Sequence, residues 1–339
     1  MTGSLKKFVA ALAALALAIG VAACGGSDSD ADSSGDGSGG SLTLVAYSTP
    51  QEAYEEIIPA FNATPEGEDV SFEQSYGASG DQRNAIIAGL DADIAALSLE
   101  PDVTALADEG IVASDWNQDK YDGFVTNSVV VFAVRKGNPK NVQDWDDLIT
   151  GDVEVITPNP FTSGGARWNV MAAYGSQIVQ GKSDEEALEF VKQMFENTPV
   201  QDASARDSLQ TFVGGKGDVL ISYENEAIAA QQAGEDIDYV IPDQTILIEN
   251  PVAVTEDADP KAQAFRDFLF TEEAQRIYQE KGYRPILKQL HDEANFPTPP
   301  GLFEIGKFGG WDKVSSEFFD PENGKVATIE EELGVATSD

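Results

Sequence analysis

The strongest constraint on the fold is a regular alternation of short apolar segments with amphipathic ones from residue 41 onward. The apolar segments are rich in Val, Ile and Leu, which is typical of buried strands, and the segments between them carry apolar residues at helical spacing. Strands that alternate with helices in this way predict an α/β fold with mostly parallel sheets. The expected strands are 42–46, 70–74, 94–97, 129–134, 153–156 and 219–222.

Helix boundaries are marked by residues that suit helix ends. Ser183 followed three residues later by Glu186 forms a capping box. Asp259-Pro260 combines an N-cap residue with proline at the first helical position. Gly282 closes the last of these helices. Beyond the segments that these caps open, helices are expected over 51–61, 82–90, 164–174 and 271–281.

The part of the chain after residue 40 is about 300 residues long, which is large for a single core and suggests two lobes. Strand-like crossings near Val129 and 246–248 divide it. We therefore expect one lobe to comprise 41–128 plus 250–339, and the other to comprise 129–249. Each lobe would be a smaller α/β unit.

The N-terminus carries the features of an export signal. A positive start at Lys6 and Lys7 precedes an uncharged apolar stretch, and Cys24 follows Val-Ala-Ala. This run resembles the lipobox of bacterial lipoproteins, which predicts a signal peptide over 1–23 and lipidation of Cys24. The alternative is an ordinary signal peptide with an incidental cysteine. The Gly/Ser/Asp-rich segment 24–40 is then a flexible tether, and the protein is expected at the outer face of the cytoplasmic membrane.

The charge balance narrows the possible partners. The formal net charge is −38, so nucleic acid and acidic membrane surfaces are poor partners because both require Lys and Arg. An anionic ligand would have to bind against this overall field.

Three loops share a pattern that can bind an anion despite the negative net charge. Each follows a strand-like segment or an extended stretch, is rich in Ser, Gly and Ala, and leads into a helix. Helix N-termini present N–H groups without intrahelical partners, and small residues allow an oxyanion to reach them without any Lys or Arg. Capping without a ligand is the alternative, with Ser79 and Gln82 as a capping box and Ser163 as an N-cap. The three loops are 75–82, 159–168 and 202–208.

The second loop carries a specific resemblance. Val155-Ile156-Thr157-Pro158-Asn159-Pro160 followed by Ser163-Gly164-Gly165-Ala166-Arg167-Trp168-Asn169 resembles the signature of the sulfate- and thiosulfate-binding proteins of ATP-binding-cassette importers. The segments 75–82 and 248–251 are most similar to the actinobacterial lipoprotein branch of that family.

This resemblance implies a two-lobed type II periplasmic-binding-protein fold with a ligand cleft between the lobes. It also implies that dehydrated sulfate is held by hydrogen bonds alone, without a countercharge, metal or cofactor, in a monomer that serves membrane permease subunits. At two positions this chain departs from the family. Tyr223 stands where the family has a tryptophan donor and could donate its phenolic O–H instead. Ser48 stands where the family has an early aspartate and could donate through its backbone or hydroxyl. The implied ligand-binding residues are Ser48, Ser79, Ser163, Gly164, Gly165, Ala205 and Tyr223.

Other ligands and other functions remain open at this point. Thiosulfate, molybdate and phosphate share the tetrahedral shape, and a protonated phosphate would need an acceptor such as Asp81, Asp202 or Asp207. An enzyme with a serine nucleophile would need a base, and the sole histidine, His291, lies in a polar segment with no supporting motif. A purely structural surface lipoprotein has no need for three such loops. Arg167 is expected to be structural and paired with a carboxylate.

Overall fold

The computed structural model describes residues 40–335 and 337. The predicted signal peptide, the predicted lipidation site Cys24 and almost all of the predicted tether lie outside the described residues. The strands are β1 (Ser41–Tyr47), β2 (Ser71–Gly77), β3 (Ile94–Ala96), β4 (Phe124–Arg135), β5 (Val155–Ile156), β6 (Val219–Tyr223), β7 (Ile237–Val240), β8 (Gln244–Val254) and β9 (Gly301–Phe303).

The helices fall between and after these strands. They are α1 (Gln51–Asn62), α2 (Ser79–Ile87), α3 (Glu100–Asp108), α4 (Gly164–Val179), α5 (Asp184–Glu196), α6 (Ala205–Val213), α7 (Glu224–Gln232), α8 (Lys261–Leu269), α9 (Glu272–Glu280), α10 (Lys288–Ala294), α11 (Gly310–Phe318) and α12 (Lys325–Leu333), with short 3-10 helices η1 (Trp145–Ile149) and η2 (Ile305–Phe308).

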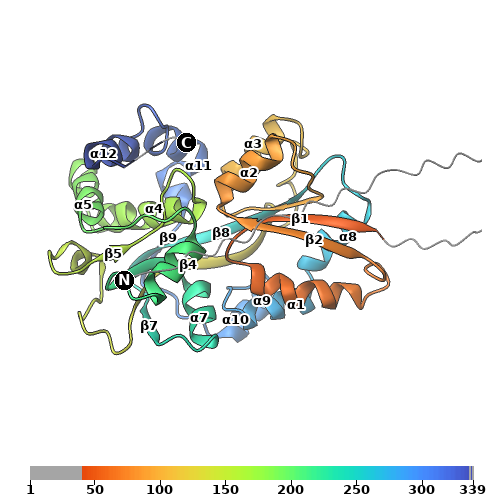
Figure 1. Ribbon diagram of the computed structural model, residues 1–339, viewed down its shortest axis with the longest axis horizontal. Coiled ribbons are helices and arrows are strands. Elements are labelled where there is room, and N and C mark those ends of the chain that lie inside the picture. The colour runs from red at the N-terminus through yellow and green to blue at the C-terminus, as the bar shows by residue number, and fades with distance from the viewer. Residues whose placement is uncertain (1–39, 336, 338–339) are drawn as a thin grey trace, which may run out of the picture. The chain divides into compact units, whose positions relative to one another are not determined.

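Two groups of strands are joined through the long strands β4 and β8. The order is β2-β1-β3-β8-β4-β6-β5, with β7 added to β4 and β9 added to β8. The N-terminal part of β4 pairs with β8, and its C-terminal part pairs with β6 and β7. The two long strands therefore run from one group into the other (Figure 1).

Strand directions differ in part from the sequence prediction. The pairs β1–β2, β1–β3, β5–β6 and β8–β9 are parallel. Strand β4 runs antiparallel to β6, β7 and β8, and β8 also runs antiparallel to β3. The prediction of mostly parallel pairing is therefore wrong for the long strands. Helical crossovers favour parallel pairing between the strands that they connect, as α8, α9 and α10 do for β8 and β9. The antiparallel partners of β4 and β8 do not directly precede or follow them in the chain.

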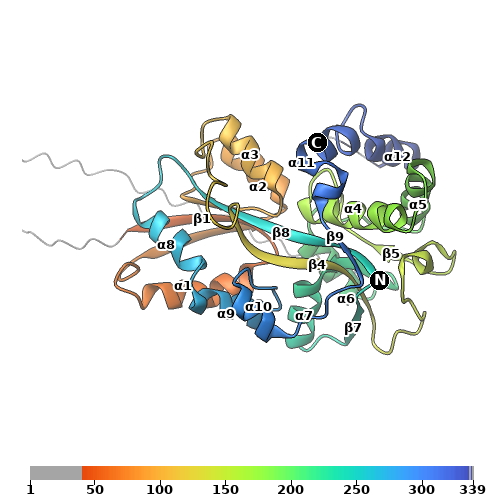
Figure 2. The same ribbon diagram turned by 180° about the vertical axis from the view of Figure 1, so that it is seen from behind.

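Helices cover both faces of each strand group. Around β1–β3, α1, α8 and α9 cover one face, with Phe61 and Phe265 in its core, and α2 and α3 cover the other. Around β4–β6, α4, α5, α11 and α12 cover one face and α6 and α7 the other. The same layering is visible from both sides in Figures 1 and 2.

The C-terminal third of the chain is divided between the two cores. Phe265 and Tyr278 pack in the core of β1–β3. Trp311 and Val326, on α11 and α12, pack in the core that contains Trp168 of α4. Residues 250–339, expected together in one lobe, thus contribute to both cores. Strand β8 extends from one strand group into the other, and β9 pairs with the N-terminal end of β8.

Local capping follows the sequence closely. The Ser183 hydroxyl accepts from the Glu186 N–H at 3.2 Å, and the Glu186 carboxylate accepts from the Ser183 N–H at 2.8 Å, which confirms the capping box. Gly282 has φ +90°, as a helix-ending glycine requires. Helix α2 begins at Ser79, three residues before the expected start, because the extended Ala78 already serves as its N-cap. This earlier start brings Ser79 into the first turn. None of the helices in the described part of the chain combines the length and apolar character that crossing a bilayer requires.

Candidate functional site

A small cavity lies where the three loops meet two strand ends. The space inside it that a water-sized sphere can enter is ≈ 10 Å³, about the size of one such sphere. It therefore suits a small ligand. The position beyond the carboxyl ends of strands is where α/β folds bind ligands. The lining comprises Tyr47, Ser48, Thr49, Gly77, Ala78, Ser79, Ser98, Ser163, Gly165, Ala205 and Tyr223.

Six of the seven predicted ligand residues are brought together in this lining. Ser48 follows β1, Ser79 begins α2, Ser163 caps α4, Ala205 begins α6 and Tyr223 ends β6. Gly165, in the first turn of α4, is the sixth. The exception, Gly164, is described with its loop below.

In the first loop, the Ser79 hydroxyl is already engaged. It donates to Asp102 Oδ2 at 2.6 Å and accepts from the Ser98 N–H at 3.0 Å. Asp102 is held in turn by Arg83 at 2.9 Å. The capping box with Gln82 is not formed, because Ser79 is itself helical and Ala78 is the N-cap. Ser79 can therefore serve an anion through its backbone N–H, which lies in the first turn of α2.

In the second loop, Ser163 is a helix cap that retains a free donor. Its hydroxyl accepts from the Ala166 N–H at 3.3 Å, which leaves the hydroxyl proton for another acceptor. A Cβ atom on Gly165 would lie 3.4 Å from Ser163 Oγ and 3.5 Å from Tyr223 Cε1, so this position faces the cavity. A Cβ atom on Gly164 would lie only 2.1 Å from Ser98 Oγ. Gly164 is required for close packing, and its role as a ligand stays a prediction.

The third loop and the end of β6 complete the cavity. Ser204 caps α6 by accepting from the Asp207 N–H at 3.2 Å, which places Ala205 in the first turn. Tyr223 is buried, and its hydroxyl has no hydrogen-bond partner of regular geometry among the described residues. Burial raises the pKa of Tyr223 well above its usual value. The phenol is therefore protonated and can donate.

Charged side chains surround the cavity without lining it. Arg206, next to Ala205, donates to Glu52 Oε2 at 2.7 Å and to Glu226 Oε1 at 3.0 Å. Burial alone would lower the pKa of Arg206, but the two carboxylates outweigh it and raise that pKa. Because Glu52 lies on α1 and Arg206 on α6, this ion pair joins the two strand groups. The residues are far apart in sequence, and no sequence pattern indicated the pair.

The carboxylates considered as phosphate acceptors are placed outside the lining. Asp202 Oδ1 accepts from the Thr211 hydroxyl at 3.0 Å, and Asp207 Oδ2 accepts from the Ser204 hydroxyl at 2.7 Å. Asp81, Asp202 and Asp207 are all absent from the cavity wall within the described chain. Each of the latter two has a local partner instead.

Arg167 does not line the cavity, and the carboxylate partner predicted for it is wrong. Its Nε donates to the Pro160 carbonyl at 2.9 Å, and its guanidinium lies 5.1 Å from the centre of the Phe319 ring. Over residues 40–335, no carboxylate lies within ion-pair distance of it. A carbonyl and an aromatic face satisfy the guanidinium in place of an acid.

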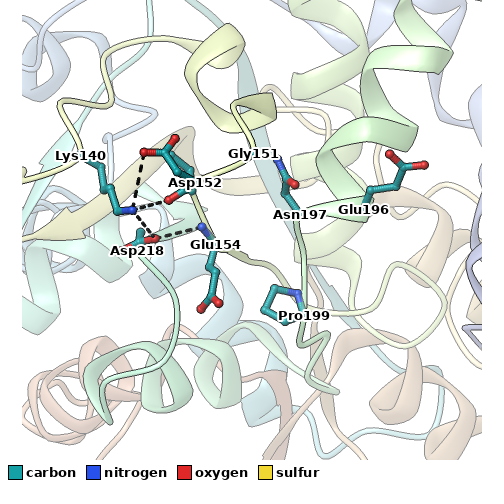
Figure 3. Close-up of a pocket in the computed structure, with 9 residues that line it drawn as sticks. Lys140, Gly151, Asp152, Glu154, Glu196, Asn197, Pro199 and Asp218 are labelled. Carbon is teal, nitrogen blue, oxygen red and sulfur yellow. Dashed lines mark hydrogen bonds and ion pairs between the residues drawn. The ribbon is translucent and has the colours of Figure 1, made fainter.

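A larger hollow elsewhere is a poor site for an anion (Figure 3). Its single cation, Lys140, lies 3.6 Å from Asp218 Oδ2 and 3.9 Å from Asp152 Oδ2. Glu154 and Glu196 add further negative charge to the wall. It shares no residue with the cavity, and none of the predicted site residues belongs to it.

Several lining residues were not predicted from the sequence. Ser98 follows β3 and precedes Leu99, the N-cap of α3, so it lies outside the three-loop pattern. The Thr49 hydroxyl lies 3.0 Å from the Tyr283 hydroxyl and belongs to the loop that leads into α1. The available signal was the same in both cases: a small polar residue two positions after the end of a buried strand.

An α/β body with a small polar cavity at converging helix N-termini defines a solute-binding protein. Comparison with known families agrees: residues 42–284 match the bacterial extracellular solute-binding proteins, and the chain belongs to that family. Membership makes it a transport protein and not an enzyme, and His291, the candidate base, is exposed on α10.

Its relatives define the branch of the family. The sulfate-binding protein of Synechococcus elongatus is 44% identical over 291 residues, which cover 82% of this chain and 83% of that protein. The structure of the sulfate-binding protein SubI from Mycobacterium tuberculosis is similar with a TM-score of 0.81 and 42% identity, covering 83% of this chain and 100% of that one. A thiosulfate-binding protein from Pseudomonas aeruginosa is 35% identical, covering 81% and 88%. The resemblance and the type II binding-protein fold expected from the sequence are thereby confirmed.

Proposed function

We propose that the protein captures sulfate outside the cell and delivers it to an ATP-binding-cassette importer. The observation that carries this proposal is the chemistry of the cavity wall. The wall offers hydroxyls and the N-termini of α2, α4 and α6, and no Lys, Arg, Asp or Glu is among its described residues. Helix N-termini and hydroxyls suit a small oxyanion.

The absence of a carboxylate from the described wall favours sulfate over phosphate. Sulfate carries no proton near neutral pH, so it needs donors only. Phosphate retains a proton and needs an acceptor, which no wall carboxylate in residues 40–335 supplies. Thiosulfate is the second candidate, because its size and charge are close to those of sulfate and a thiosulfate-binding relative is 35% identical.

We further propose that two lobes close on the ligand. The ends of β4 and β8 lie in different strand groups, so these strands can act as the connections. The Glu52–Arg206 ion pair is one contact that opening would break. The first lobe would comprise 41–128 and the early part of 250–339, and the second would comprise 129–249 together with α11 and α12, which pack on its core.

For the N-terminus, the proposal is a lipid anchor at Cys24 that holds a monomer near its permease. An acyl-anchored protein would stay at the outer face of the cytoplasmic membrane, and several acyl chains together hold firmly. Changing Cys24→Ala should release a ligand-competent protein into the medium. A variant that remains in the membrane fraction would argue against the anchor.

The sulfate proposal is tested by calorimetric titration of the ligand-free protein with sulfate, thiosulfate, molybdate and phosphate. Sulfate should bind most tightly, thiosulfate more weakly and phosphate least. Tighter binding of phosphate than of sulfate would contradict the donor-only cavity, and tighter binding of thiosulfate would favour the second candidate.

A further inference from the structure

We infer that the Ser98 hydroxyl is an additional hydrogen-bond donor to the bound oxyanion. This inference rests on the proposed function and names a residue that neither the loop pattern nor the family resemblance includes. Ser98 lines the cavity, the residue is 1% exposed, and its Oγ makes no hydrogen bond of regular geometry with residues 40–335.

The backbone of Ser98 is fixed from several directions. Its N–H donates to Ser79 Oγ at 3.0 Å, and its carbonyl accepts from Trp168 Nε1 at 2.9 Å and from Asn250 Nδ2 at 3.3 Å. Ser79 belongs to the first strand group and Trp168 to α4 of the second. The hydroxyl is therefore held in one place at the cavity wall.

The second loop approaches Ser98 more closely than any side chain would allow. A Cβ atom on Gly164 would lie 2.1 Å from Ser98 Oγ. The hydroxyl thus sits against the N-terminal turn of α4, which carries Ser163 and Gly165. The Tyr223 hydroxyl is also near: a side-chain hydrogen bond with Ser98 lowers the pKa that burial of the phenol raises. The geometry of this contact is irregular, and neither hydroxyl has a regular partner among the described residues. Ser98 lies among the groups proposed to hold the anion.

Burial without a partner is the feature that points to a ligand. A buried hydroxyl with no partner is unfavourable, and such groups in native structures call for an explanation. An oxyanion in the cavity would supply the missing acceptor. Ser222 provides a contrast: its hydroxyl is equally buried and unpaired in the described structure, but it precedes Tyr223 in β6 and so lies on the other face of the sheet.

The test compares Ser98→Ala with Ser222→Ala by calorimetric titration with sulfate. Ser98→Ala should weaken binding by about ten- to a hundred-fold, as expected for one hydrogen bond to a charged group. Ser222→Ala should bind like the wild type. Ser98→Cys, which has similar size but a weak S–H donor, should fall between Ser98→Ala and the wild type.

Thermal unfolding without ligand separates binding from structure. Removing a buried hydroxyl that has no partner should leave the midpoint of Ser98→Ala unchanged or raised. A lowered midpoint with unchanged sulfate affinity would assign Ser98 a structural role and overturn the inference. Equal weakening by Ser98→Ala and Ser222→Ala would overturn it too.

The failure of the proposed function is distinguishable from these outcomes. If the wild-type protein binds sulfate and Ser98→Ala binds it equally tightly, only the role of Ser98 is overturned. If the wild type binds none of sulfate, thiosulfate, molybdate and phosphate, the proposed function and the role of Ser98 are both overturned.

Discussion

The cavity and the charged cluster around Arg206 are adjacent, but the cavity is lined by neutral groups whereas the cluster consists of paired charges. Ala205 lines a wall whose described residues include no charged side chain. The next residue, Arg206, is bound to Glu52 and Glu226. The Arg206 guanidinium is therefore one residue away from the site in sequence, but it pairs with carboxylates and joins the two strand groups. A ligand in the cavity meets neutral donors while the nearby charges are satisfied by each other.

This contrast explains how an anion can bind to a chain with a net charge of −38. The positive ends of the α2, α4 and α6 dipoles act at short range inside a desolvated cavity. Surface carboxylates act from farther away, and salt screens charges beyond about 8–10 Å. The local dipoles therefore dominate at the site.

The largest expected effect comes from placing a charge inside the neutral cavity. Gly165→Asp should abolish sulfate binding. At an effective dielectric of about 20 and a separation of about 4 Å, each pair of like unit charges costs roughly 4 kcal/mol. A doubly charged ligand would lose about 8 kcal/mol, which equals the binding free energy of a micromolar complex. Calorimetry measures the loss, and circular dichroism checks the fold.

Gly165→Asn is the matched control, because it adds nearly the same volume without the charge. It should weaken binding but leave it measurable. If both variants lose binding equally, size and not charge excludes the ligand, and the electrostatic contrast fails.

The second prediction breaks the charged cluster and leaves the cavity neutral. Arg206→Met leaves Glu226, 1% exposed as a side chain, without its cation. Losing one partner of a buried ion pair destabilises by about 3–5 kcal/mol. Chemical denaturation should show this loss, with sulfate affinity affected less than stability. Adding Glu226→Gln should recover much of the stability, and a single variant as stable as the wild type would contradict the assignment.

A smaller effect is expected at Glu330, a buried carboxyl without a cation. Burial raises its pKa from 4.5 to about 7, although a hydrogen bond from Gln201 opposes this. Between those pH values the folded state binds more protons than the unfolded state, so stability falls as pH rises. Glu330→Gln should raise the unfolding free energy by about 1–3 kcal/mol above pH 7 and have little effect near pH 4.

The neighbouring Glu331, which is exposed on the same helix, gives the control for this titration. As an exposed substitution, Glu331→Gln should change the unfolding free energy by less than about 0.5 kcal/mol. A wild-type profile that is flat between about pH 5 and pH 8 would show that Glu330 titrates normally.

The sequence predicted the parts of the site that depend on local chemistry. Ser163 and Ala205 stand where an extended segment gives way to a helix, and small residues at such junctions are a local signal. The start of α2 was placed too late because Ser, Gly and Asp are weak helix formers, although Asp and Ser suit a first turn.

What the sequence could not predict depends on contacts between distant residues. Glu52 and Arg206 meet across the strand groups, and Ser98 lies at the cavity against Gly164 of another loop. The hydrogen bond from the Ser79 hydroxyl to Asp102 is likewise a tertiary contact. The antiparallel course of β4 and β8 follows from sheet assembly and leaves no mark in the alternation of strands and helices.

The central claim is that only neutral groups hold the anion, and the pH dependence of sulfate affinity tests it most directly. Burial raises the pKa values of Tyr47 and Tyr223 above their usual range, and hydroxyls and N–H groups do not titrate near neutrality. Because burial raises the pKa values of Glu249 and Glu330 to about 7, the measurement is repeated with both changed to Gln. In this double variant and in the wild type, affinity should change less than about twofold across the histidine titration range of roughly pH 5–8. A tenfold loss per pH unit that persists in the double variant would mean that an ionisable group touches the ligand, which would contradict the account.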